Sequence, residues 1–185
     1  MAIFGITPKK KRTGASVLRV RALPGAPQRG LLTCGPLVVP CALGRSGLTR
    51  MKREGDGATP VGRFALLAGF RRTDRTLPVA APFALVPVRR DDGWCDDPTD
   101  GRYNRPVRLP FAPSHEVMTR DDRLYDLVIV LDVNIRSRRL GRGSAVFFHL
   151  ARPDFGPTAG CVAIAPDAMR RLLPRLSHDA VMVIG

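Results

Sequence analysis

The chain has few of the residues that build metal centres or membrane-spanning segments. Its 185 residues include three histidines and four cysteines, and no two cysteines form a CxxC pair. The cysteines are Cys34, Cys41, Cys95 and Cys161, and the histidines are His115, His149 and His178. Such scattered spacing argues against a structural zinc site, so we expect no bound metal. No apolar run approaches the roughly 20 residues that span a bilayer, so we expect no transmembrane segment.

Acidic residues are absent until Glu54, whereas lysines and arginines recur from Lys9 onward. The formal net charge of +14 attracts polyanions, which include nucleic acid, anionic membranes and carboxylate-bearing polymers. Charge alone does not choose among them, and a merely solvated basic surface remains open. Residues 1–14 contain four consecutive basic residues and are typical of a disordered arm, whereas residues 15–185 suit one domain. The sequence as written shows no secretory signal, because its basic cluster follows the short apolar start.

Hydrophobic patterning predicts a mainly β domain with a minor helical part. Residues 16–22 alternate between apolar and basic, which is typical of a strand with one buried face. Further strands are expected at 31–43 (two strands joined at Gly35-Pro36), 63–70, 124–134, 144–150 and 180–184. Pro40 indicates that the second of the joined strands lies at an edge or ends early. Residues 71–118 are rich in proline and should be mostly loop, with short strands near 83–88 and 107.

One helix is expected near the carboxyl end. In "PDAMRRLLPRL" the apolar residues recur at helical spacing from Pro166, and Pro174 should end or kink the helix. Cys34 and Cys41 allow two interpretations. They are either a disulfide across a hairpin in an exported protein or two small buried strand residues.

The stretch "HLARPDFGPTAGC", residues 149–161, joins a histidine to a cysteine. A nucleophilic cysteine needs its thiolate form, and a histidine within hydrogen-bond reach supplies it by taking the proton. His149 ends an apolar strand, and the turn-rich loop can return the chain to that strand end. Gly160 lets a substrate carbonyl approach Cys161 and lets backbone N–H groups converge on its oxyanion. On this spacing alone, a core thiol and a core histidine are the favoured interpretation.

Three motifs together resemble the L,D-transpeptidase catalytic domain, the YkuD family. They are "TAGC" at 158–161, the upstream His149, and "KREGDGATPVGRF" at 52–64. "YDLVIVLDVN" followed by "GRGSAVFFHLA" further resembles the smaller bacterial branch of the family. The resemblance covers residues 16–185. It implies a β-sandwich of mixed sheets with a C-terminal helix followed by a last strand.

Carried over residue by residue, the resemblance makes Cys161 the acylated nucleophile and His149 its general base. Gly160 and Cys161 would supply backbone donors to the oxyanion, and Thr158 would shape the loop. Ala159 stands where many members have a second histidine, and Val162-Ala163 replaces a common Ile-Arg pair.

The role of the missing arginine is expected to pass to another basic residue near the site. We expect Arg142 or Arg152 to contact substrate in its place, with Arg102 as a further basic residue of the groove. Trp94, in an acid-rich loop, either walls the substrate groove or anchors the core.

The implied activity is cysteine-dependent acyl transfer on peptidoglycan stem peptides without a cofactor. Attack on meso-diaminopimelate would give a thioester, which an amine resolves by cross-linking or exchange, and a carbapenem would acylate the same cysteine. The alternatives are an L,D-carboxypeptidase or wall-detaching hydrolase of the same fold, and a non-catalytic polyanion-binding module. We expect a monomer without specific nucleic-acid binding. The substrate implies the periplasm or cell envelope, although the absence of a visible signal leaves the cytoplasm open.

Overall fold

The structure is a computed structural model that describes residues 14–185. The arm predicted at 1–14 therefore lies almost wholly outside the described residues. The strands are β1 (Ala15–Leu23), β2 (Ala26–Cys34), β3 (Leu37–Ala42), β4 (Leu48–Thr49), β5 (Thr59–Pro60), β6 (Gly62–Arg71), β7 (Leu85–Pro87), β8 (Asp92–Cys95), β9 (Arg105–Arg108), β10 (His115–Val117), β11 (Leu127–Leu131), β12 (Phe147–Leu150), β13 (Val162–Ile164) and β14 (Leu176–Ile184). The helical segments are α1 (Pro166–Leu172) and the 3-10 helix η1 (Leu173–Arg175). The predicted mainly β fold, with a C-terminal helix before a last strand, is confirmed.

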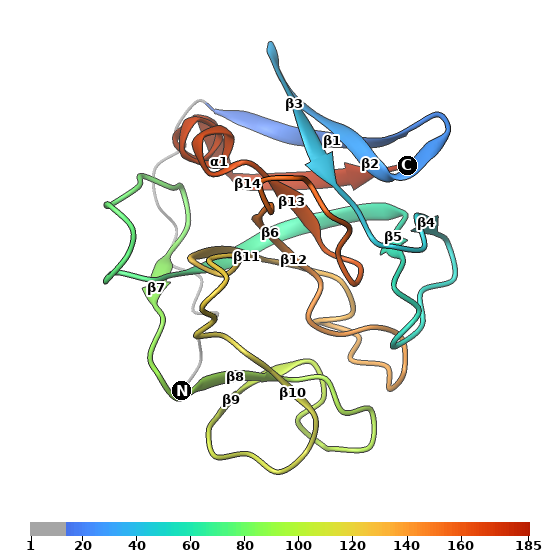
Figure 1. The fold of residues 1–185 in the computed structure, drawn as a ribbon, viewed down its shortest axis with the longest axis vertical. Helices are drawn as coiled ribbons and strands as arrows, with labels where there is room; N and C mark the ends of the chain where they lie inside the picture. The colour runs from blue at the N-terminus through green and yellow to red at the C-terminus, as the bar shows by residue number, and fades with distance from the viewer. Residues whose placement is uncertain (1–13) are drawn as a thin grey trace.

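The largest sheet has the strand order β11-β12-β13-β3-β2-β1-β14-β6-β7 and closes on itself, because β11 also pairs with β6. The sheet is mixed, because it contains parallel pairs, such as β1 with β14 and β12 with β13, among antiparallel ones. Figure 1 shows β1, β2 and β14 on one side and β6, β11 and β12 on the other. A continuous apolar core fills the space between these two sides. Because the sheet closes on itself, its two sides pack face to face, as expected for the β-sandwich of mixed sheets that the resemblance implies.

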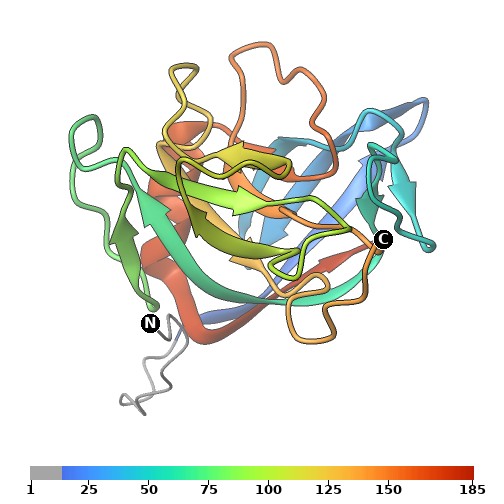
Figure 2. The same cartoon turned by 90° about the horizontal axis from the view of Figure 1, so that it is seen from below.

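Strands β11 and β12 face two different cores, because successive side chains of a strand point to opposite sides. Phe148 and Leu150 lie in the core of the closed sheet. Phe147 belongs to a second core on the outer side, together with Val128 and Cys161. A three-stranded sheet of β8, β9 and β10 covers that outer side, as Figures 1 and 2 show. His149, which shares a face with Phe147, is thereby enclosed between the two sheets.

Helix α1 begins at Pro166 and buries one side against the main core. Met169 and Leu172 are fully buried there. Asp167 lies in the first turn, and Arg170 and Arg171 lie in the last, which complements the helix dipole. Pro174 falls in η1, where the α-helix has already ended, as predicted. Within residues 14–185, no helix is long and apolar enough to cross a membrane.

Several strands differ from the predicted bounds. The strand expected at 144–150 begins only at Phe147, because Gly143 and Ala145 adopt positive φ values of 93° and 47°. Strand β11 is limited to Leu127–Leu131. The segment 71–118 contains β8 and β10 besides the two short strands predicted in it. Strands of three or four residues are too short for periodicity to reveal.

The hairpin of β2 and β3 decides between the two interpretations of its cysteines. Cys34 lies opposite Leu37, and Cys41 lies opposite Gly30, so the two thiols do not face each other. Both are free and buried, as strand residues of the core. Pro40 pairs with Leu31 of β2 on one side of β3. On the other side, only Cys41 and Ala42 pair with β13, so, within residues 14–185, Pro40 lies at a free edge of the sheet there.

Asn104 joins the small sheet to the loop before β12. Its Oδ1 accepts hydrogen bonds from Trp94 Nε1 at 3.0 Å and from the Ala145 N–H at 3.2 Å. Its Nδ2 donates to the Val133 carbonyl at 3.1 Å. The side chain is 1% exposed, so water cannot replace these bonds.

Substituting Asn104→Ala should lower the free energy of unfolding by about 2–4 kcal/mol, since it leaves buried polar groups unpaired. Urea unfolding of the variant and of wild type measures the change. The exposed Arg90→Ala serves as the control and should stay within about 0.5 kcal/mol of wild type. An Asn104 variant as stable as that control would contradict this account of the inter-sheet link.

Candidate active site

His149 in one strand and Cys161 just before the neighbouring strand line the same cavity, which has a volume of about 460 Å³. His149 is in β12, and Cys161 directly precedes β13, which pairs in parallel with β12. Phe148 lies opposite Val162 in this register, which places Cys161 beside Phe147. Because Phe147 and His149 point to the same side of β12, the thiol and the imidazole also share that side. Two residues separated by a long loop are thus brought together by the sheet.

The Cys161 sulfur is held by two backbone groups. The Phe147 N–H donates to Sγ at 3.2 Å, and Sγ lies 3.3 Å from the Ala145 carbonyl, to which the thiol donates. Cys161 is 7% exposed. Burial raises the pKa of Cys161 to about 12, although the Phe147 N–H opposes this. In the free protein the thiol therefore holds its proton at neutral pH.

One ring nitrogen of His149 is hydrogen-bonded to the backbone, and the other is available to accept a proton. Its Nδ1 lies 2.8 Å from the Leu150 carbonyl, which can only accept, so Nδ1 carries the hydrogen. Nε2 of the neutral ring is then a proton acceptor. Burial lowers the pKa of His149 to about 4, against the opposing effect of the Leu150 carbonyl. The edge of Tyr125 packs against the ring at a centroid distance of 5.3 Å.

No hydrogen bond joins His149 to Cys161 among those of residues 14–185. A neutral thiol and a neutral imidazole, rather than a preformed ion pair, therefore define the resting state.

Thr158 fixes the loop that leads to Cys161. Its hydroxyl donates to the Cys161 carbonyl at 2.7 Å and accepts from the Gly160 N–H at 3.1 Å. The hydroxyl of Thr59 also donates to the Cys161 carbonyl, at 3.4 Å. Thr158 thus shapes the loop. The expectation that Gly160 supplies an oxyanion donor differs from the structure, because its N–H is already taken by Thr158.

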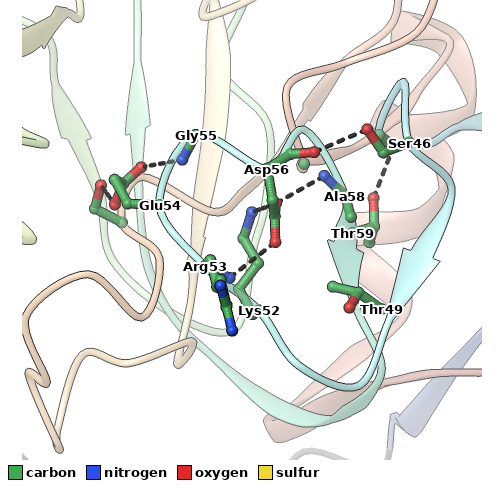
Figure 3. A network of polar contacts seen from close by, with 12 residues as sticks. Ser46, Thr49, Lys52, Arg53, Glu54, Gly55, Asp56, Ala58 and Thr59 are labelled. Atoms are coloured by element: carbon green, nitrogen blue, oxygen red, sulfur yellow. Dashed lines mark hydrogen bonds and ion pairs between the residues drawn. The ribbon is translucent and has the colours of Figure 1, made fainter.

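The "KREGDGATP" stretch, residues 52–60, lies between the cysteine loop and the loop before β12 and contacts both. Asp56 accepts from Lys52, from the Arg53 N–H at 2.8 Å and from the Ala58 N–H at 2.9 Å (Figure 3). Burial alone would raise the pKa of Asp56, but these bonds hold it below its usual value. The carboxylate is therefore a charged anchor for the turn.

Glu54 links the 52–60 segment to the loop before β12. Its carboxylate accepts from the Tyr103 hydroxyl and from the Ser144 hydroxyl, the latter at 2.7 Å. Its backbone N–H donates to the Gly141 carbonyl at 2.9 Å. One short turn therefore holds both loops that flank the thiol.

The cavity carries charges of both signs, most of which the sequence analysis missed. The basic residues of the lining are Arg45, Lys52, Arg120 and Arg152, and the acidic ones are Glu54, Asp96 and Glu116. Tyr125 donates to Glu116 at 3.3 Å, and the Arg120 guanidinium lies over the Tyr125 ring at 5.0 Å. Within the described part of the chain, no three histidine, cysteine or carboxylate side chains are grouped to hold a metal ion.

Of the residues predicted to contact substrate, only Arg152 lines the cavity, where it donates to the Pro157 carbonyl at 3.4 Å. Arg142 is exposed and lies outside the lining, and Arg102 is exposed and paired with Asp100. Trp94 is 1% exposed and also lies outside the lining. Its ring packs edge-on against Phe147 at 5.1 Å, so it anchors the second core rather than walling the groove.

Fold and site together define a mainly β protein with a cysteine and a histidine facing one charged cavity. The family model of the L,D-transpeptidase catalytic domain, YkuD, matches residues 35–184, and the chain belongs to this family. The predicted family is thus confirmed. Comparisons with curated proteins and with solved structures return no match.

Replacing His149 with Gln should make stability less sensitive to acid. The imidazole of the unfolded chain binds a proton near pH 6.5, whereas that of the folded chain stays neutral to about pH 4. The lowered pKa of His149 therefore makes the free energy of unfolding of wild type depend on pH. The full free energy is present above pH 6.5, and about 2–3 kcal/mol of it is lost as the pH falls to 4.5. Urea unfolding of both proteins at pH 7.5 and 4.5 measures the difference. Equal losses in the two proteins would contradict a buried neutral imidazole.

Proposed function

We propose that the protein is a cysteine-dependent acyltransferase acting on peptidoglycan stem peptides, an L,D-transpeptidase. The observation that carries this proposal is the common cavity onto which Cys161 and His149 both open. Membership of the L,D-transpeptidase family supports the substrate class. Both groups are held by backbone contacts, so substrate meets a rigid arrangement.

In the first half-reaction, Cys161 attacks the carbonyl carbon of meso-diaminopimelate in a tetrapeptide stem. The thiol proton passes to His149 Nε2, the sulfur lone pair forms the C–S bond, and the carbonyl π electrons move onto oxygen. When the tetrahedral intermediate collapses, the C–N bond to D-alanine breaks. His149 returns its proton to the departing amine, and a thioester remains.

In the second half-reaction, an amine replaces D-alanine in the reverse sequence. His149, neutral again, takes a proton from the attacking amine as the new C–N bond forms. The C–S bond then breaks, and His149 returns the proton to the sulfur, which regenerates the thiol. A diaminopimelate side-chain amine gives a cross-link, and a free D-amino acid gives exchange. Water in the same position gives L,D-carboxypeptidase action.

The basic part of the cavity wall suits the carboxylates of a stem peptide. Arg45, Arg120 and Arg152 line it from three different segments of the chain. Guanidinium groups bind carboxylates through charge-assisted hydrogen bonds. Because this substrate lies outside the cytoplasmic membrane, the proposal places the protein in the periplasm or cell envelope, which fractionation of the native cell tests.

Incubation with tetrapeptide muropeptides, followed by mass spectrometry, tests the function. Wild type should release D-alanine and form dimers linked between diaminopimelate residues. Cys161→Ser should lower this turnover at least about 10³-fold, because a serine hydroxyl is a much weaker nucleophile than a cysteine thiol. The matched control Cys34→Ala removes another buried thiol, which lies outside the cavity lining, and should keep wild-type turnover.

Other products identify the alternatives. Tripeptide monomers without dimers would show a carboxypeptidase. No conversion, combined with salt-sensitive binding to nucleic acid that survives Cys161→Ser, would replace catalysis with polyanion binding.

A further inference from the structure

The side chain of Lys52 extends to the loop that leads to Cys161. Its Nζ lies 3.2 Å from the position that a Cβ on Gly160 would occupy. Gly160 directly precedes Cys161 and has a φ of 138°. Lys52 also lines the cavity. The ammonium is therefore placed beside the residue next to the nucleophile.

Two glycines make room for this placement. A Cβ on Gly143 would come within 2.8 Å of the Lys52 Cγ, so the lysine stem passes directly over the Gly143 backbone. A Cβ on Gly160 would meet the Ala58 carbonyl at 2.9 Å besides approaching Nζ. Side chains at these positions would block the path of Lys52 to the cysteine loop.

Asp56 holds the ammonium without using all of its donors. Lys52 Nζ donates to Asp56 Oδ1, which is its one hydrogen bond among those of residues 14–185. An ammonium has three N–H groups, so two remain available for a ligand. The lysine side chain is only 12% exposed, which limits competition from water.

The proposed reaction needs such a donor. An oxyanion forms at the attacked carbonyl and is stabilised by donors placed in advance. The Gly160 N–H is occupied by the Thr158 hydroxyl, so of the two backbone donors that the family resemblance implies, only the Cys161 N–H remains for the oxyanion. We infer that Lys52 is a catalytic residue whose ammonium donates a hydrogen bond to the oxyanion formed by attack of Cys161. Lys52 keeps its protons throughout, and His149 alone transfers one.

This inference rests on the proposed function, and steady-state kinetics with muropeptides test it. Lys52→Met keeps the stem that packs on Gly143 and removes the donors. We expect kcat to fall by about 10²-fold or more, with KM changed less than about threefold. Lys52→Arg restores a charged donor and should recover at least a tenth of the wild-type kcat. Arg53→Met is the matched control, because it removes a charge from an exposed neighbouring side chain outside the lining, and should retain wild-type kinetics.

The outcomes separate this inference from the proposed function. If wild type turns over and Lys52→Met keeps its kcat, or raises only KM, the catalytic role of Lys52 is overturned. If wild type itself has no turnover, the proposed function fails instead. Thermal melting checks that each variant folds. Should Lys52→Met fail that check, Lys52→Gln, which keeps a donor to Asp56 without a charge, takes its place with the same expected loss of kcat.

Discussion

The site depends on the close approach of the 52–59 segment to the loops on either side of the thiol. Glycine at 143 and at 160 leaves space that a single Cβ would fill, and Lys52 occupies it. Asp56 and Glu54 hold this contact together, the first by fixing the turn and the second by binding the loop before β12. The "GD" signature, far from Cys161 in sequence, is thus a direct support of the cysteine loop.

Burial sets the chemical state of the cavity. The same desolvation that raises the pKa of Cys161 lowers that of His149, so both groups are neutral until a substrate arrives. A neutral pair has no charge to attract competing ions, and a thiol held by Phe147 and Ala145 is oriented before it is activated. In the proposed reaction, the thiol is activated only during the attack, when charge appears on the substrate oxygen and on the imidazole.

Strand patterning and local motifs predicted much of this molecule. Alternating residues predicted β1, the mostly apolar stretch at 63–70 predicted β6, and the helical spacing after Pro166 predicted α1. The motif around Cys161 and His149 identified the two groups that face the cavity. Lys52, Glu116 and Tyr125 were missed, because their roles depend on tertiary contacts between segments far apart in the chain. Thr158 was expected to shape the loop, but its capture of the Gly160 N–H depends on a local turn that a motif does not reveal.

The central claim is that Cys161 forms an acyl-enzyme in this cavity, and intact-protein mass spectrometry after incubation with a carbapenem tests it most directly. The thiol attacks the carbonyl of the strained β-lactam ring of the carbapenem. The C–N bond that breaks lies within that ring, so no part of the molecule leaves. Wild type kept under reducing conditions should therefore gain the full mass of one carbapenem molecule, with the adduct mapping to Cys161, whereas Cys161→Ser should gain none. An unmodified wild-type protein, or an adduct that persists in Cys161→Ser, would contradict the claim.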